Sequence, residues 1–150
     1  MKMEINIRKA NKGDLKQYIN LVSIANNELQ RIIQKKIKYT YKEIIKDFKK
    51  DLKSKIILVA ENNNKIKGYL VGSIQNQYSK KVGHIHILFV LTKFRKKGIA
   101  KSLINEFIKF LKKNKIKRVK LNVNVENKNA IKVYKKINFK ITRHELNKEI

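Results

Sequence analysis

A basic loop that carries a glycine, placed between an apolar run and a helical pattern, is the strongest chemical signal in this sequence. The loop reads Arg95-Lys96-Lys97-Gly98-Ile99-Ala100 and follows the apolar residues 85–90. A strand that ends at such a loop and continues as a helix directs several unpaired backbone N–H groups at one point, with the positive end of the helix dipole behind them. The pattern therefore predicts a pyrophosphate-binding loop.

Two histidines precede this loop on the same predicted strand. His84 and His86 are two positions apart, so they face the same side of that strand. Each is a candidate base, although a lone histidine on a strand is more often structural than catalytic. Glu61 and Glu126 are further candidates, each acting through a water molecule.

The elements that would position these groups begin with a strand and two helices. Residues 5–7 alternate between apolar and polar types, as in a strand. Helical spacing follows after Asn11 and Asp14, either of which can cap the first helix. Thr40 and Glu43 form a capping box at the start of the second helix.

Three strands are then predicted to form an antiparallel meander. They cover residues 56–60, 66–74 and 82–91, joined by polar turns at residues 61–65 and 76–81.

The pattern changes after the loop to a strand–helix–strand crossover. A helix is expected over residues 98–113 and a strand over residues 119–125. A crossover of this length requires parallel neighbouring strands. A last helix is expected over residues 130–137, and residues 139–141 are expected to start a closing strand. The sequence therefore favours the α/β (α+β) class with a mixed sheet.

Composition fits one domain over residues 1–150. The hydrophobic content of 42% is enough for an ordinary core, and the absence of cysteine excludes disulfides and thiolate catalysis. The polar start at residues 1–4, without an apolar run near 18 residues, predicts neither a signal peptide nor a membrane span. We expect a cytoplasmic monomer or homodimer.

The formal net charge of +27 raises the possibility of a nucleic-acid partner. The chain contains 33 Lys, 23 Ile and 17 Asn, which are the amino acids whose codons are richest in A and T. The lysines are scattered over all predicted elements and are not interleaved with aromatic residues that stack on bases. Coding bias is thus the favoured explanation, and specific nucleic-acid binding is not expected; a basic RNA-associated module stays open as the alternative of a different class.

The loop resembles the acyl-CoA loop of the GNAT N-acetyltransferase superfamily, whose pattern is Gln or Arg, two residues, Gly, one residue, then Gly or Ala. A second stretch, residues 127–139 (NKNAIKVYKKINF), resembles the family's pattern of Asn, two residues, Ala-Ile, then Tyr, then Gly-Phe. Three positions depart from the family: Thr92 replaces a frequent proline, and Lys96 and Asn138 replace frequent glycines. Asn138 tolerates a left-handed backbone, so the last turn can survive.

The resemblance implies the GNAT fold, a mostly antiparallel sheet with a central parallel strand pair flanked by helices, and acetyl-CoA as cosubstrate without a metal. It places the coenzyme pyrophosphate on backbone N–H groups of the loop, with Arg95 and nearby lysines screening its charge. It places the pantetheine amides on the edge of the strand before the loop. The implied coenzyme-binding residues are Leu88, Phe89, Val90, Arg95, Lys96, Lys97, Gly98, Ile99, Ala100, Lys101 and Asn127, although Asn127 also fits a helix N-cap.

The resemblance also implies catalytic roles. Tyr134 matches a tyrosine that protonates the departing CoA thiolate, with core packing as the alternative. His84 resembles a histidine of some archaeal N-terminal acetyltransferases. Asn122 stands where the ribosomal-protein branch, which this core resembles, has its glutamate base. The candidate catalytic residues are therefore Tyr134, His84 and His86.

The reaction implied is direct attack of an amine on acetyl-CoA in one ternary complex. An α-amine with a pKa of 7.7–8.0 is about one-quarter neutral near pH 7.4, whereas a lysine amine is neutral in roughly one molecule per thousand. Because Asn122 cannot act as a base, a protein or peptide N-terminal α-amine is the first acceptor hypothesis. A small-molecule amine, such as an antibiotic or a metabolite, is the alternative. Tyr18, Tyr39 and Tyr41 could line an acceptor pocket, or serve core and surface packing.

Overall fold

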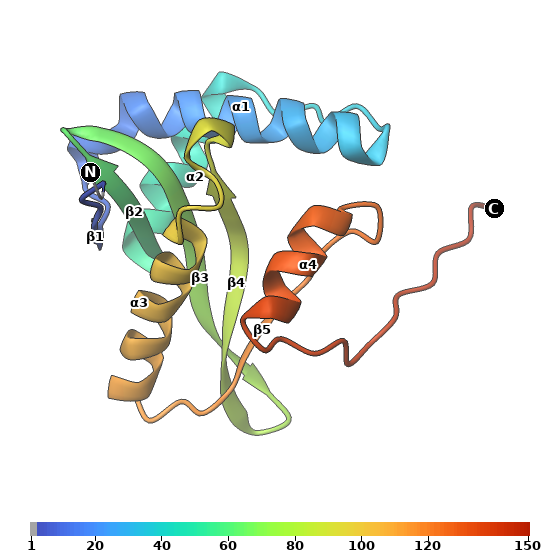
Figure 1. Cartoon of the computed structure of the whole chain (residues 1–150). Helices are drawn as coiled ribbons and strands as arrows, with labels where there is room; N and C mark the ends of the chain where they lie inside the picture. Colours follow the sequence, from blue (N-terminus) through green and yellow to red (C-terminus); the bar gives the residue numbers. More distant parts are fainter. Residues whose placement is uncertain (1–2) are drawn as a thin grey trace.

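Five strands form one sheet in the order β1-β2-β3-β4-β5 in the computed structural model, which describes residues 3–150 (Figure 1). The strands are β1 (Asn6–Lys9), β2 (Ile56–Asn62), β3 (Lys65–Gln77), β4 (Lys80–Val90) and β5 (Val119–Leu121). The first four pair antiparallel, and β4 and β5 pair in parallel. The predicted meander, crossover and mixed sheet are confirmed. Met1 and Lys2, part of the polar start considered above, lie outside the described residues.

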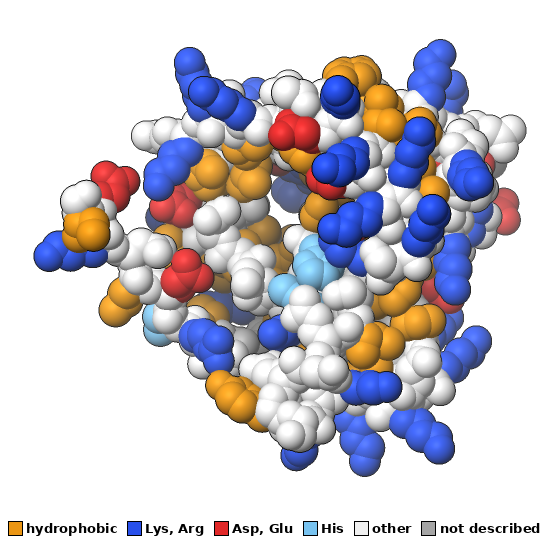
Figure 2. Space-filling view, turned by 180° about the vertical axis from the view of Figure 1, so that it is seen from behind, with side chains coloured by type: hydrophobic (Ala, Val, Ile, Leu, Met, Phe, Trp, Pro, Cys, Tyr) orange, Lys and Arg blue, Asp and Glu red, His pale blue; other side chains and the backbone are white. Residues whose placement is uncertain are grey.

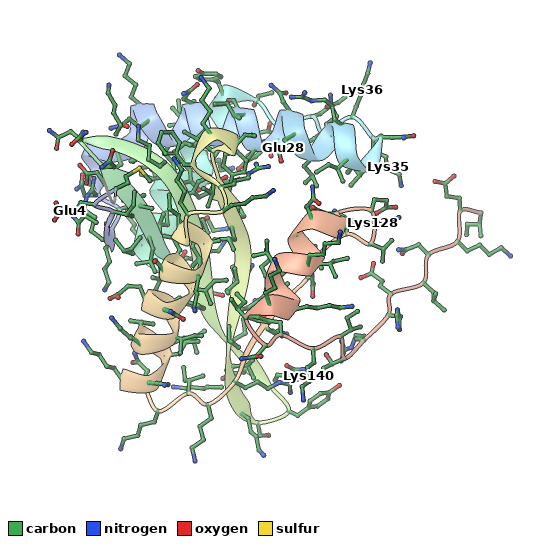
Figure 3. All side chains as sticks on the ribbon, viewed as in Figure 1. Glu4, Glu28, Lys35, Lys36, Lys128 and Lys140 are labelled. Atoms are coloured by element: carbon green, nitrogen blue, oxygen red, sulfur yellow. The ribbon has the colours of Figure 1, made fainter. Side chains whose placement is uncertain are left out.

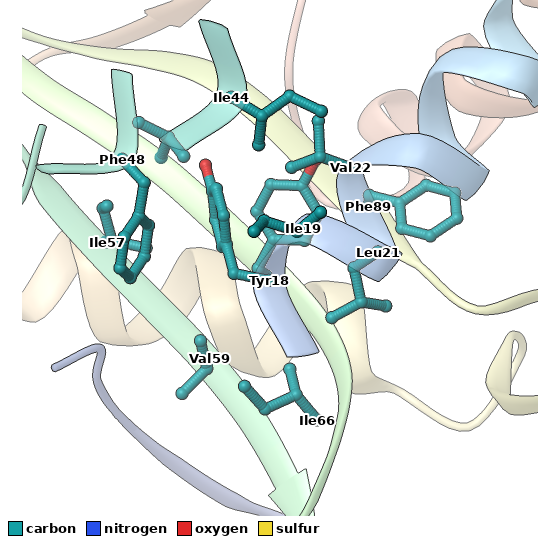
Figure 4. Close-up of a cluster of buried hydrophobic side chains, with 12 residues drawn as sticks. Tyr18, Ile19, Leu21, Val22, Ile44, Phe48, Ile57, Val59, Ile66 and Phe89 are labelled. Carbon is teal, nitrogen blue, oxygen red and sulfur yellow. The ribbon is translucent and has the colours of Figure 1, made fainter. Parts of the chain in front are cut away.

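Helices cover both faces of the sheet. They are α1 (Leu15–Ile33), α2 (Tyr41–Ser54), α3 (Ile99–Lys113) and α4 (Lys128–Lys136), with short 3₁₀ turns η1 (Lys12–Asp14) and η2 (Thr92–Phe94). A first apolar cluster joins α1 and α2 to one face, around Tyr18, Phe48 and Tyr69 (Figure 4). A second joins α3 to the other face, around Leu103 and Phe107. The core is thus split by the sheet, and each helix layer buries its own apolar face.

The capping box predicted at the start of α2 is confirmed. Thr40 N–H donates to the Glu43 carboxylate at 2.6 Å, and Glu43 N–H donates to Thr40 Oγ1 at 3.3 Å. At η1 the cap is Asn11, whose side chain accepts from Gly13 N–H. The Asp14 carboxylate does not cap α1 and instead receives two bonds of 2.8 Å from the Arg8 guanidinium, which lowers its pKa.

Two hairpin turns are shorter than the turns predicted from the polar stretches at residues 61–65 and 76–81. The β2–β3 turn consists of Asn63 and Asn64, and the β3–β4 turn of Tyr78 and Ser79, all with left-handed φ between 48° and 62°. Two consecutive left-handed residues match the right-handed twist of the paired strands. The strands therefore extend into the predicted loops.

The C-terminal part differs from the prediction in two ways. The strand expected over residues 119–125 ends at Leu121, and the closing strand expected over residues 139–141 is not formed. With only three paired residues, β5 offers a short edge for a further strand. The residues after Ile141 are mostly polar and exposed, so pairing them would bury little apolar surface. The end of the chain instead runs away from the sheet beyond α4 (Figure 1).

None of the helices within residues 3–150 combines the length and the apolar character that crossing a membrane requires.

Candidate active site

A bulge in β4 lies at the centre of the site. Val71 pairs with Ile87 and the next residue, Gly72, pairs with Ile85, so His86 is an extra residue whose backbone has no pairing partner on β3. The bulge shifts the alternation of β4: Ile85 packs on the α3 side, whereas Phe89 packs on the α1 side. Bulges of this kind redirect side chains beside functional sites.

Beyond this bulge, one edge of β4 is open. Pairing with β5 covers only Gly83, His84 and Ile85. On the other edge, Leu91 N–H donates to Lys67 O at 2.8 Å, and bonded pairs alternate along an antiparallel ladder. The backbone groups of Phe89 therefore face β3. Those of Leu88 and Val90 face the open edge. Val90 O accepts from Arg95 Nε at 2.8 Å there, and the other groups lie where an extended ligand can bind like an added strand.

The predicted loop follows directly from this edge. Lys96 and Gly98 have left-handed φ angles of 59° and 80°, and Gly98 is the N-cap position of α3. Ser102 N–H makes the first helical bond, to Gly98 O at 2.9 Å. No side chain caps this end of α3, so the N–H groups of Ile99, Ala100 and Lys101 point outward from the helix N-terminus.

The space around Gly98 fits an anion. A Cβ placed on Gly98 would meet no other atom within 4 Å, so the backbone at this turn is open to a ligand. Lys96, Lys97 and Lys101 are exposed around it. Unpaired N–H groups, the helix dipole and surrounding cations together match a pyrophosphate.

The two histidines contact each other beside the bulge. Their ring centroids are 4.3 Å apart, and His86 Nε2 lies 2.7 Å from Ser73 Oγ. The buried His84 Nδ1 has no hydrogen-bond partner within the described chain. Burial lowers the pKa of His84, as do His86 and Lys120; burial, Lys55 and Lys120 lower the pKa of His86, against an opposing effect of Asp51. Both imidazoles are therefore neutral at neutral pH.

A pocket of about 220 Å³ opens between α1, α2 and β4. We call it the α1–α2 pocket; it is lined by Tyr18, Val22, Tyr39, Ile44, Asp47, Phe48, Lys50, Asp51, Lys55 and Ile87. Tyr39 O–H donates to the Asp47 carboxylate, and Lys55 Nζ lies 3.1 Å from Asp51 Oδ1. Figure 2 shows histidine side chains in the hollow of this face, with lysines and arginines around it. Of the three tyrosines considered above, Tyr18 and Tyr39 line the pocket, and Tyr41 is 64% exposed.

Tyr134 lies on α4 and packs against the α3-side core. Its ring centroid is 5.8 Å from that of Phe139, and burial raises its pKa to about 12. The following turn uses Asn138 in a left-handed conformation, with φ 70°, as the sequence indicated. Phe139 N–H donates to Tyr134 O at 3.0 Å, which closes the turn.

The remaining candidates have other contacts. The Asn127 side chain accepts from Ala130 N–H at 3.2 Å, so it caps α4 as the sequence allowed. Glu61 is held by Arg8 at 2.5 Å, and Glu126 is exposed. Within residues 3–150, no three potential ligands come together as a metal site would require.

The comparisons with known proteins agree with this geometry. A family model described as "Acetyltransferase (GNAT) family" matches residues 22–139. The chain belongs to the GNAT acetyltransferase family. Its fold and its enzyme class, an N-acetyltransferase with acetyl-CoA as cosubstrate, follow from this membership.

Two archaeal relatives and one solved structure illustrate the similarity. An uncharacterized N-acetyltransferase of Methanocaldococcus jannaschii is 34% identical over 136 residues, which cover 89% of this chain but 59% of that protein. An N-alpha-acetyltransferase of Sulfurisphaera tokodaii is 29% identical over 153 residues, covering 94% of this chain and 85% of that protein. An aminoglycoside N-acetyltransferase, AAC(6')-Iy in complex with CoA, has a TM-score of 0.83 at 20% identity, covering 100% and 97% of the two chains. At 20% identity, the similarity to this aminoglycoside N-acetyltransferase shows only that the two proteins share a fold.

Three features of the candidate site had no signal in the sequence. The bulge at His86 depends on pairing with β3, Ser73 on β3 contacts His86 on the adjacent strand β4, and the α1–α2 pocket is built from elements far apart in the chain. The alternation of polar and apolar residues predicts which face of its strand Ser73 occupies, whereas nothing in the sequence indicates that it contacts His86.

Proposed function

We propose that this protein transfers the acetyl group of acetyl-CoA to the α-amino group of a peptide or protein N-terminus. The single observation that carries the choice of acceptor is the pair of neutral histidines beside the α1–α2 pocket. Burial and nearby cations lower the pKa of both His84 and His86, so the site offers only weak bases. Weak bases suit an amine that is already partly neutral, such as an α-amine. A cytoplasmic location stays a prediction.

The proposed coenzyme contacts divide between two backbone regions. The N–H groups from Lys96 to Lys101 bind the pyrophosphate, with Gly98 at the turn. The backbone groups of Leu88 and the N–H of Val90 pair with the pantetheine amides, since Val90 O accepts from Arg95 Nε; Phe89 supports the strand through its core packing. Asn127, which caps α4, is the remaining proposed coenzyme contact.

The proposed reaction is a direct transfer. The neutral amine nitrogen attacks the thioester carbonyl carbon, a C–N bond forms, and the C–S bond breaks. The proton lost by the amine goes to His84 or His86, directly or through water. The departing CoA thiolate accepts a hydrogen bond, and then a proton, from the Tyr134 hydroxyl, which is protonated at neutral pH because its pKa is about 12; the tyrosinate left behind regains its proton from water.

This mechanism predicts a particular dependence on pH. As pH falls, kcat/KM falls first through the pKa of the α-amine, 7.7–8.0, and then more steeply as the imidazole base becomes protonated. Because the pKa of the imidazole is lowered, the midpoint of this second fall is expected below the ordinary histidine value of about 6.5. Lys120→Gln removes a cation that lowers the pKa of both imidazoles, so it should move the midpoint upward.

The matched control for this pH profile is Lys117→Gln, which removes the same charge at an exposed position that does not influence either histidine. It should leave the midpoint unchanged. An acidic limb that does not respond to Lys120→Gln, or that responds equally to both variants, would contradict proton transfer to this pair.

Acceptor mass spectrometry tests the acceptor class. The enzyme is incubated with acetyl-CoA and three acceptors: a peptide with a free α-amine, the same peptide blocked at its N-terminus but containing lysine, and an aminoglycoside. We expect acetylation of the free α-amine only. Modification of the aminoglycoside alone would establish the small-molecule alternative. The carboxylates of Asp47 and Asp51 in the pocket favour that alternative. Modification of lysine would contradict the argument from weak bases.

A further inference from the structure

The Arg95 side chain makes three contacts at the end of β4. Its Nε donates to Val90 O at 2.8 Å, and one terminal nitrogen donates to Glu28 Oε2 at 2.6 Å. The guanidinium carbon also lies 5.6 Å from the centroid of the Phe89 ring. Glu28 belongs to α1 and is 67 residues away in the chain. One side chain thus joins α1, the open end of β4 and the first residue of the pyrophosphate loop.

Glu28 lies on the side of α1 that faces the end of β4 (Figure 3). Its side chain is 29% exposed and that of Arg95 is 37% exposed, so this ion pair is partly shielded from water. By contrast Lys93, Lys96 and Lys97, on either side of Arg95, are exposed. Positive charge for a polyanion is therefore abundant in the loop without Arg95, whose charge is already matched by Glu28.

The three contacts need a guanidinium. A planar fork can donate in two directions and stack on an aromatic ring at the same time, whereas a lysine ammonium is a point charge on a flexible stem. Charge-assisted bonds of this kind are about twice as strong as neutral ones. The shape of the side chain, and not only its charge, is what the site uses.

We propose that Glu28 and Arg95 are positioning residues for the coenzyme loop. The pair fixes the start of the loop against β4 and α1, so that the N–H groups from Lys96 to Lys101 converge on one point; Arg95 acts through the backbone and is not a general phosphate-screening charge. This inference rests on the proposed coenzyme site. It also links α1, which lines the α1–α2 pocket, to the coenzyme side of the enzyme.

Calorimetry with acetyl-CoA at 50 and 200 mM salt tests the role of fork geometry. Arg95→Lys keeps the net charge, so we expect the Kd to rise about 10-fold at both salt concentrations, through the loss of charge-assisted bonds. Glu28→Gln should raise the Kd about 3- to 10-fold. The double variant should bind acetyl-CoA as tightly as Arg95→Lys does, because the two residues act as one unit. In steady-state assays KM for acetyl-CoA should rise while kcat changes little.

Two controls separate this role from surface charge. Lys97→Gln removes one exposed cation and should alter mainly the salt dependence of binding. Glu106→Gln removes an exposed carboxylate paired with Lys109 on α3 and should leave the Kd unchanged. Wild-type affinity in Arg95→Lys would overturn the inference, since charge alone would then suffice.

Hydrogen exchange gives a readout that does not depend on the coenzyme. In both Glu28→Gln and Arg95→Lys, backbone amides of residues 92–101 should exchange faster than in the wild type, while those of α2 should not. If the wild type does not bind acetyl-CoA, the proposed function is wrong. The exchange rates of residues 92–101 then still decide whether Glu28 and Arg95 position the loop. Unchanged exchange in the loop would overturn it.

Discussion

Gly98→Glu is expected to weaken acetyl-CoA binding by about 100-fold or more, because like charges brought together cost several kcal/mol and 1.4 kcal/mol is a factor of ten. The side chain would extend from the turn at which the N–H groups of the α3 N-terminus converge. A Cβ at Gly98 meets no protein atom within 4 Å, so the new carboxylate can lie in the anion site without a clash. Isothermal titration measures the loss.

The matched control is Gly98→Asn. Asparagine tolerates the left-handed φ of 80° better than most residues and adds no charge, so it separates backbone strain from electrostatic exclusion. We expect only a several-fold loss of affinity in this variant. Equal affinity of Gly98→Glu and the wild type would mean that the pyrophosphate does not bind at this turn.

Tyr134→Phe is expected to lower kcat about 100-fold, at the lower end of what general acid catalysis contributes. The variant keeps the ring that packs against Phe139 and removes only the hydroxyl. Burial raises the pKa of Tyr134 to about 12, so the phenol is protonated throughout the working range and available to the leaving thiolate. Steady-state kinetics should show the fall in kcat with little change in the KM for acetyl-CoA.

Tyr78→Phe is the matched control for this substitution. Tyr78 lies at the β3–β4 turn and is 85% exposed, so loss of its hydroxyl should change neither kcat nor stability. Thermal unfolding should give similar Tm values for both variants and the wild type. A Tyr134→Phe enzyme with wild-type kcat would show that Tyr134 serves only to pack α4.

The parts of the fold that depend on local patterns could be predicted. The capping box of Thr40 and Glu43, the three-strand meander and the crossover around α3 each follow from spacing within a short window. The loop at Gly98 belongs to this group, because a strand, a glycine turn and a helix start are all local. The position of the candidate coenzyme site therefore follows from the sequence.

The parts that depend on distant partners could not. The bulge at His86 appears only when β3 and β4 are paired, and the contact of Glu28 with Arg95 joins residues 67 positions apart. The prediction of a closing strand at residues 139–141 was wrong, because alternating apolar residues form a strand only beside an edge that is long enough to pair with. The edge of the three-residue β5 is too short.

Titration of the wild-type protein with acetyl-CoA, CoA and ATP at moderate salt tests most directly whether this chain is a coenzyme-dependent acetyltransferase. The open β4 edge and the N–H groups of the loop predict one-to-one binding of acetyl-CoA and CoA, with ATP much weaker. Equal and salt-sensitive binding of all three ligands would mean that the lysines attract polyphosphates non-specifically and that no specific coenzyme site is present. That result would contradict the proposed coenzyme site and the function that depends on it.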